Sequence, residues 1–134
     1  MILDAFKLDD KVALVTGASA GLGQAIAIAF AEAGAHVACH GNSRAPAATC
    51  EAIRQLGRRA LAVTGDLSDR QTPGKLFEET INHFGRLDIL VNNAGTIRRA
   101  PAVDYSEADW DTVIEVNLSS VFRLSQFAGR QMIA

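Results

Sequence analysis

Short apolar runs alternate with longer segments of helical periodicity along this chain, and Gly or Asp stands at nearly every junction. Unbroken aliphatic runs are typical of strands that are buried on both faces of a parallel sheet. The pattern predicts four strands, at residues 12–15, 37–39, 61–64 and 87–92. The segments between them predict helices at 21–33, 47–56 and 68–84, each followed by a helix-ending glycine.

Two short motifs predict where later helices begin. Ser68 with Gln71 three residues on resembles a capping box for the third helix, and Ser106 with Asp109 repeats the pattern. The second cap introduces a long helical segment that runs to Ala134.

Strands and helices in this order predict an α/β fold. Right-handed helical crossovers between parallel strands give a Rossmann-like doubly wound sheet, here of about four strands in the order 3-2-1-4 with flanking helices. A chain of 134 residues with 49% hydrophobic content can form one modest core. We therefore expect residues 1–134 to form a single domain. In such a sheet a ligand binds beyond the carboxyl ends of the strands, where the strand order reverses.

The polar motifs lie at those strand ends. Thr16 and Gly17 close the first strand, and Gly21 and Gly23 open the next helix, where glycine lets the backbone approach a pyrophosphate. Asp66 follows the third strand and has the chemistry to accept a hydrogen bond from an adenine amino group. Asn92 ends the fourth strand and Asn93 follows it, where both are expected to tie the strand to its neighbours and to line the cleft. Each motif alone is also compatible with an ordinary turn.

Together these motifs resemble the short-chain dehydrogenases/reductases in order and spacing: TGxxxGxG, Gly65-Asp66-Leu67, Asn92-Asn93-Ala94-Gly95 and Val116-Asn117. The segments Leu56 to Arg59 and Ile97 to Arg99 are similar to the 2-deoxy-D-gluconate 3-dehydrogenase group within that family. The resemblance implies cofactor contacts from a set of residues at the strand ends: Thr16, Gly17, Ser19, Gly21, Leu22, Gly23, Asn42, Asp66, Leu67, Asn93, Ala94 and Gly95.

The resemblance also implies a catalytic tetrad of Asn, Ser, Tyr and Lys, of which only the asparagine is matched, at Asn117. The alternative is a buried polar residue in a helix, satisfied by backbone groups. Tyr105 is the only tyrosine, Asp109 stands four residues later and no lysine follows Lys75, so Tyr-x-x-x-Lys is absent. The chain is therefore expected to be the cofactor-binding half of an NAD(P)-dependent oxidoreductase, truncated and inactive alone. The alternative is a catalytically inactive nucleotide-binding or interaction module.

The residues at the end of the second strand bear on whether the cofactor is NAD or NADP. An Asp or Glu is expected there to bind the ribose 2′-OH of NAD, and counting places Gly41 at that position. Asn42 is available to hydrogen-bond a free ribose, whereas Arg44 is available to attract a 2′-phosphate. Ala20 stands where many NADP-preferring relatives resemble one another in carrying Arg. NAD is favoured by the subgroup resemblance, and NADP is not excluded.

Arg98 and Arg99 follow the fourth strand on the cleft side, where guanidinium groups can bind the carboxylate of a small sugar-acid substrate. The alternatives are a solvated pair or an ion pair with Asp104 or Glu107.

Composition excludes several other classes. A net charge of −2 without any basic run argues against nucleic-acid binding, and no 18-residue apolar stretch or signal sequence is present, so a cytoplasmic protein without membrane contact is expected. Cys39 and Cys50 lack CxxC spacing and are expected to be reduced. His36, His40 and His83 share no ligand spacing, so no metal site is predicted and surface or strand-end positions are expected.

The strand order leaves strand four as a sheet edge, with Ile89, Leu90 and Val91 on it. An unprotected apolar edge pairs readily with other chains. We therefore expect the 134-residue chain to form homo-oligomers or to associate through this strand and the final helix. Light scattering checks this, and a sharp monomer peak with cooperative unfolding would contradict it.

Overall fold

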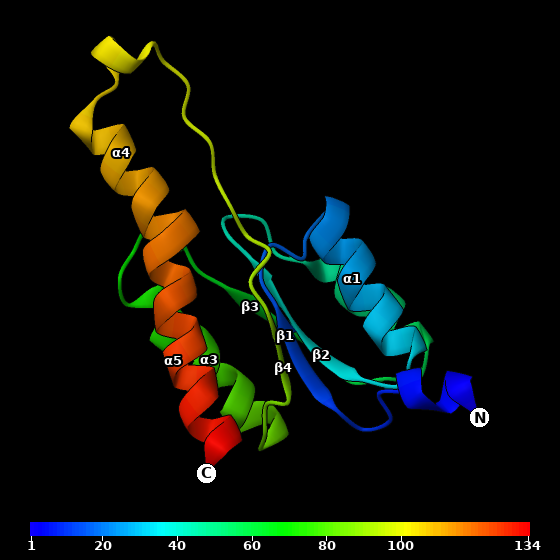
Figure 1. Cartoon of the computed structure of the whole chain (residues 1–134). Coiled ribbons are helices and arrows are strands. Elements are labelled where there is room, and N and C mark those ends of the chain that lie inside the picture. Colours follow the sequence, from blue (N-terminus) through cyan, green and yellow to red (C-terminus); the bar gives the residue numbers. More distant parts are fainter.

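The computed structural model describes all residues, 1–134, and is built on one parallel sheet (Figure 1). Its four strands are β1 (Val12–Val15), β2 (His36–Gly41), β3 (Ala60–Thr64) and β4 (Ile89–Val91). Their order is β3-β2-β1-β4, and each neighbouring pair is parallel. The predicted α/β class, Rossmann-like topology and strand order are confirmed, although β4 is shorter than the predicted 87–92.

Helices cover both faces of this sheet, with α1 and α2 on one side and α3 and α5 on the other (Figure 1). The helices are α1 (Gly21–Glu32), α2 (Ala47–Gln55), α3 (Thr72–Phe84), α4 (Glu107–Ile114) and α5 (Ser120–Ile133). Shorter turns are η1 (Ile2–Phe6), η2 (Ala102–Asp104) and η3 (Glu115–Ser119). The segment between β4 and α4 rises away from the sheet and carries only η2.

Strand β1 is the centre of the core, and all four of its side chains are buried. Leu14 lies in the apolar layer below α3 and α5, together with Leu76 and Leu124. Val15 points to the other layer, where it packs with Ala27 and Ile53. This double burial explains why β1 appears in the sequence as an unbroken apolar run.

The predicted capping box at Ser68 is wrong, because α3 begins at Thr72 and its N-cap, Gln71, makes no side-chain bond. Ser68 instead donates from its backbone N–H (2.9 Å) and its hydroxyl (2.8 Å) to Oδ1 of Asp66. An aspartate that bonds the backbone two residues on forms its own turn. Because the chain forms this local turn at Asp66, α3 begins about one helical turn later than predicted. The cap at Ser106 is confirmed, since its Oγ accepts from Asp109 N at 3.1 Å.

The predicted long final helix is present, but it is interrupted. Between α4 and α5, η3 is a single π turn, in which the backbone hydrogen bonds span one residue more than in an α-helix. Arg123 of α5 pairs with Glu115 across this turn. Inside α-helices, π turns of this kind occur often at functional sites.

Strand β4 is an edge, as predicted, and its three side chains are half-buried. A shallow groove of about 390 Å³ runs beside it, lined by residues of β4 and α5: Asp88, Ile89, Leu90, Asn92, Ser125, Ala128, Gly129 and Met132. No helix of the structure has the length and apolar character needed to cross a membrane.

Asp88 joins β4 to β1 at the amino-terminal edge of the sheet. Its Oδ2 accepts from Val12 N at 2.9 Å, and its Oδ1 accepts from Arg86 Nη2 at 2.6 Å. Burial acts to raise the pKa of Asp88, but Arg86 and the Val12 N–H outweigh it, so the pKa is below its usual value.

Replacing Asp88→Ala leaves the buried N–H of Val12 without a partner. We expect the free energy of unfolding to fall by about 1–3 kcal/mol, the usual cost of such a group. Urea unfolding measures it. Asp104→Ala, an exposed change, is the control and is expected to stay within about 0.5 kcal/mol of the parent. Equal stability of the two variants would contradict the role of Asp88.

Candidate functional site

One cavity of about 370 Å³ lies at the carboxyl ends of all four strands. The loops after β1, β2, β3 and β4 each contribute to its wall, and α4 and η3 close it from one side. Its lining residues are Gly17, His40, Asn42, Asp66, Leu67, Ser68, Asn93, Ala94, Gly95, Thr96, Arg98, Thr112 and Val116. A cavity at the reversal of strand order is where doubly wound sheets bind ligands.

Two glycines, one in the loop after β1 and one in the first turn of α1, are too closely packed for a side chain. Gly17 has φ +63°, and a Cβ there would lie 3.0 Å from Asn93 Nδ2. A Cβ at Gly23 would lie 2.0 Å from the carbonyl oxygen of Gly17, so the first turn of α1 packs directly on the loop. By helix geometry the first N–H groups of α1 have no partner within the helix and can receive an anion.

Asn93 and Thr16 bind the ends of β4 and β1 to each other. Asn93 Nδ2 donates to the carbonyl oxygens of Thr16 (3.1 Å) and Gly17 (3.2 Å). In return, Thr16 Oγ1 accepts from the backbone N–H groups of Asn93 (3.0 Å) and Ala94 (2.9 Å). The prediction that Asn93 ties the strands together is confirmed. Asn92 does not line the cavity, because its amide points to α5 and donates to Ser125 Oγ at 3.3 Å.

Asp66 and Leu67 line the cavity from the end of β3. The backbone N–H and hydroxyl of Ser68, with a smaller contribution from Arg98, hold the pKa of Asp66 below its usual value. The exposed carboxylate is therefore ionised at neutral pH and can accept further hydrogen bonds. Leu67 is 4% exposed and joins the core below the cavity floor.

Gly41 ends β2, as the residue count predicts, but it has no room for a side chain. A Cβ at Gly41 would lie 1.9 Å from the carbonyl oxygen of Arg44 and 2.5 Å from Ser19 Oγ. Ser19 donates to that same carbonyl at 2.8 Å, which fixes the turn after β2. A Gly41→Asp replacement, which the sequence suggests as a test of NAD preference, would disrupt this turn. Asn42 is the residue of the turn that lines the cavity.

Asn117 lies in the π turn η3 and binds the segment after β4. Its Oδ1 accepts from Thr96 N at 2.8 Å, and its Nδ2 donates to Thr96 O at 2.9 Å. The amide thus pairs with both main-chain groups of one residue, as a neighbouring strand would. Asn117 itself is exposed and stands behind Thr96, outside the cavity wall.

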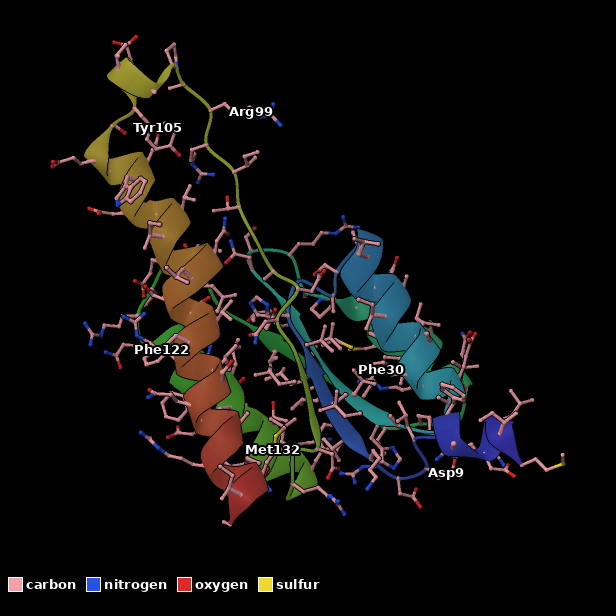
Figure 2. All side chains as sticks on the ribbon, viewed as in Figure 1. Asp9, Phe30, Arg99, Tyr105, Phe122 and Met132 are labelled. Carbon is pink, nitrogen blue, oxygen red and sulfur yellow. The ribbon has the colours of Figure 1, made fainter.

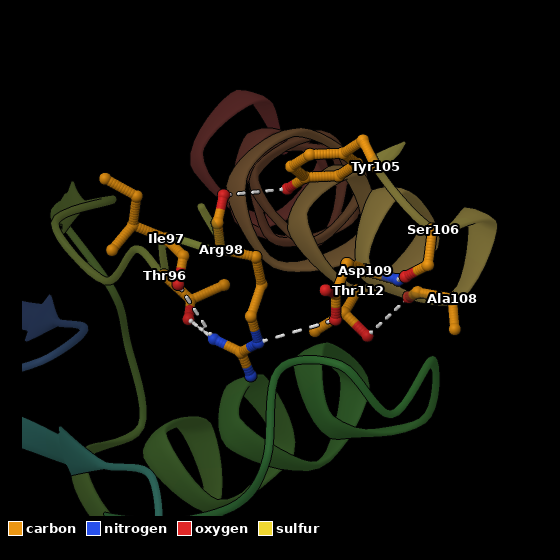
Figure 3. A network of polar contacts seen from close by, with 8 residues as sticks. All are labelled: Thr96, Ile97, Arg98, Tyr105, Ser106, Ala108, Asp109 and Thr112. Atoms are coloured by element: carbon orange, nitrogen blue, oxygen red, sulfur yellow. Dashed lines mark hydrogen bonds and ion pairs between the residues drawn. The ribbon is translucent and has the colours of Figure 1, made fainter. Parts of the chain in front are cut away.

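The two predicted arginines have different surroundings. Arg98 lines the cavity, and its Nη1 donates to Thr96 Oγ1 (2.8 Å) and Ile97 O (3.0 Å) (Figure 3). Its ion-pair partner is Asp109, at 3.9 Å from Nε, and not Asp104 or Glu107. Tyr105 donates from its hydroxyl to Arg98 O at 3.0 Å, which confirms its expected position before the helix. Arg99 is exposed and extends away from the chain (Figure 2).

Thr16, Ser19, Gly21, Leu22 and Gly23 do not line the cavity. Thr16 is buried beneath it, and the others form the loop and first turn at its margin.

His40 is a cavity residue that the sequence-based reasoning missed. It lies near the end of β2, as expected of a strand-end histidine, but is only 1% exposed. The sequence signal that could have identified His40 is its position as a polar residue at the end of the apolar run 37–39. Cys39 and Cys50 are free and buried, as expected, and their contact together with burial raises the pKa of Cys39.

Comparison with known proteins identifies the family of this chain. The sequence model of the short chain dehydrogenase family matches residues 11–134. The chain belongs to this family. Of the motif residues, Gly17, Asp66, Leu67, Asn93, Ala94 and Gly95 line the cavity at the strand ends.

Several relatives are similar to this short-chain dehydrogenase chain. It is 47% identical over 133 residues to 2-dehydro-3-deoxy-D-gluconate 5-dehydrogenase of Dickeya dadantii strain 3937, covering 99% of this chain and 52% of the relative. A solved structure from Agrobacterium tumefaciens, assigned to 2-deoxy-D-gluconate 3-dehydrogenase and holding NADP, is 43% identical with a TM-score of 0.83, covering 96% of this chain and 50% of that one.

A short chain dehydrogenase from Burkholderia cenocepacia J2315 in complex with NADP gives a TM-score of 0.91 at 40% identity, covering 94% of this chain and 52% of that chain. The present chain spans about half the length of the curated relatives that it matches.

The turn after β2 yields a stability prediction. Gly41→Ala places a methyl group against the Arg44 carbonyl, and we expect the free energy of unfolding to fall by about 1–3 kcal/mol, as overpacking usually costs. Gly129→Ala in α5 meets no atom within 4 Å and is the matched control. It is expected to stabilise by up to about 1 kcal/mol through helix propensity. Urea unfolding compares the two, and a tolerated Gly41→Ala would contradict the tight turn.

Proposed function

We propose that residues 1–134 form one dinucleotide-binding domain of an NAD(P)-dependent oxidoreductase. The observation that carries the proposal is the single cavity to which the loops of all four strands contribute, next to the amino-terminal turn of α1. The NADP bound to two solved relatives of the same family supports it.

The residues fit the parts of a dinucleotide in turn. The tight packing of Gly17 and Gly23 leaves the backbone accessible to the pyrophosphate at the start of α1, beside Ser19, Gly21 and Leu22. Asp66 would accept from the adenine amino group. Asn93, Ala94 and Gly95, which follow β4, form the adjoining part of the cavity wall.

Both NAD and NADP are compatible with the end of β2. NAD remains the expected cofactor, with Asn42 as the partner of its ribose. Because Gly41 has no room for a carboxylate, nothing at this position repels a 2′-phosphate. Arg44 in the same turn supplies a positive charge that NADP would use.

The substrate class that we propose is a deoxy sugar acid, whose secondary alcohol or ketone exchanges a hydride with the nicotinamide. The names of the similar dehydrogenases support this class. Arg98 is the candidate partner of the carboxylate, because it lines the cavity while Arg99 does not.

Hydride transfer also needs a group that moves the hydroxyl proton. Tyr105, the only tyrosine, uses its hydroxyl on Arg98 O, and no lysine follows Lys75. We propose Asn117 as the asparagine of the catalytic tetrad, which would act through the segment that it holds at Thr96. These 134 residues alone are therefore expected to bind the cofactor without turnover.

We propose that copies of this domain associate with one another. Leu118 and Phe122 near the start of α5 are each 61% exposed, and the edge of β4 is unpaired. A cytoplasmic location remains our expectation.

Calorimetric titration of the 134-residue chain with NAD, repeated with NADP, tests the proposal. We expect saturable binding, about ten- to hundredfold weaker for Asp66→Ala, because a hydrogen bond to a charged group contributes about 1.5–3 kcal/mol. Asp104→Ala is the control and should bind like the parent. Absence of binding of either nucleotide by the folded chain would overturn the proposal.

A further inference from the structure

His40 is the one buried ionisable side chain in the cavity wall. We propose that His40 is a positioning residue, whose neutral ring holds the phosphate-binding loop after β1 and the Asp66 turn after β3 in fixed relation to each other. The inference deepens the proposed function and, for its effect on affinity, rests on it.

The hydrogen bonds of the ring define its protonation state. Gly17 N donates to His40 Nδ1 at 3.1 Å, so Nδ1 must carry a lone pair. Nε2 lies 2.8 Å from the carbonyl oxygen of Gly65, which can only accept, so Nε2 must carry the proton. Both contacts are satisfied at once only by the neutral ring with hydrogen on Nε2.

These two bonds reach opposite sides of β2. Gly17 belongs to the loop that leads into α1, and Gly65 is the residue before Asp66. The main chain adds to the bridge, because Ala18 N donates to His40 O at 2.7 Å and Gly65 N donates to Gly41 O at 3.2 Å. His40 therefore connects the loops that would hold the pyrophosphate and the adenine.

Protonation would break this bridge on one side. A proton on Nδ1 would face the N–H of Gly17, so two donors would oppose each other within a buried site. The other charged groups in the cavity wall are Asp66 and Arg98, which have opposite signs. The remaining lining residues, from β1 to η3, are not titratable near neutral pH.

Burial lowers the pKa of His40 below its usual value, and the bond to Gly65 O opposes this only in part. The ring is therefore neutral in the folded protein at neutral pH. As pH falls from the ordinary histidine pKa through that of His40, the neutral ring is lost, and nucleotide affinity should fall with it.

The experiment uses the full 134-residue chain, first without nucleotide. ¹⁵N NMR of the histidine rings from pH 8 to pH 5 is expected to show His40 with hydrogen on Nε2, and the Gly17 amide should shift with the same midpoint. A ring that carries hydrogen on Nδ1, or that titrates without any change at Gly17, would overturn the bridge. This readout does not depend on nucleotide binding.

Calorimetry with NAD over the same pH range then measures the functional effect. NAD is the probe because its pyrophosphate, unlike the 2′-phosphate of NADP, does not titrate in this range. We expect the dissociation constant to rise by up to tenfold per pH unit below the His40 midpoint.

Two variants and one control separate positioning from general stability. In His40→Asn, Oδ1 replaces Nδ1 as the acceptor for Gly17, and in His40→Gln, Nε2 replaces the donor to Gly65. Neither residue titrates, so the affinity of either variant should be independent of pH across the range. Each variant keeps only one of the two bonds of the bridge, so each should bind NAD more weakly than the parent does at pH 8.

His36→Asn is the matched control, because His36 Nδ1 also accepts a backbone N–H, from Arg59 at 2.9 Å, at the far end of the same strand. It should keep the pH dependence of the parent. A pH dependence that survives in both His40 variants would overturn the inference. NAD binding that is absent from the parent at every pH would overturn the proposed function instead, and the ring spectra would still decide the bridge.

Discussion

The parallel pairing of β1 with both β2 and β4 is the constraint on which the rest of the structure depends. Because these strands run in the same direction, the polar residues that follow each of them emerge at one edge of the sheet. The hydroxyl oxygen of Thr16 accepts hydrogen bonds from the backbone N–H groups of both Asn93 and Ala94. The cavity, the glycine loop and the Asp66 turn are all positioned relative to this buried connection.

The fold was predictable because β1 and β2 are buried on both faces, and burial of that kind leaves a continuous apolar pattern. The first turn of α3 was not, because Asp66 and Ser68 compete for the same local hydrogen bonds, and only the folded loop decides between them. The π turn at Asn117 has no sequence signal of its own. Its Asn117 pairs with Thr96, which is 21 residues away in the chain, and no local pattern shows such a contact.

The sequence predicted which residues form the site better than it predicted where their side chains point. Gly17, Asp66 and Asn93 follow strands, and strand ends of a parallel sheet meet. The sequence could not distinguish Arg98 from Arg99, because adjacent residues in an extended segment point to opposite sides. Nor could it show that the Arg44 carbonyl occupies the space beside Gly41, since that contact depends on how the turn closes.

The π turn η3 also sets the phase of everything that follows it. A π turn is equivalent to one extra residue in an α-helix, and one residue corresponds to a rotation of roughly 100° about the helix axis. Leu124 and Ala128 face the sheet only because this rotation has been made. The segment from Ser106 to Ser120 therefore holds one residue more than a regular α-helix needs between the same two ends. Loss of that residue would return η3 to α geometry with the apolar side of α5 still facing β1 and β4, whereas regular α geometry at the present length would turn that side away.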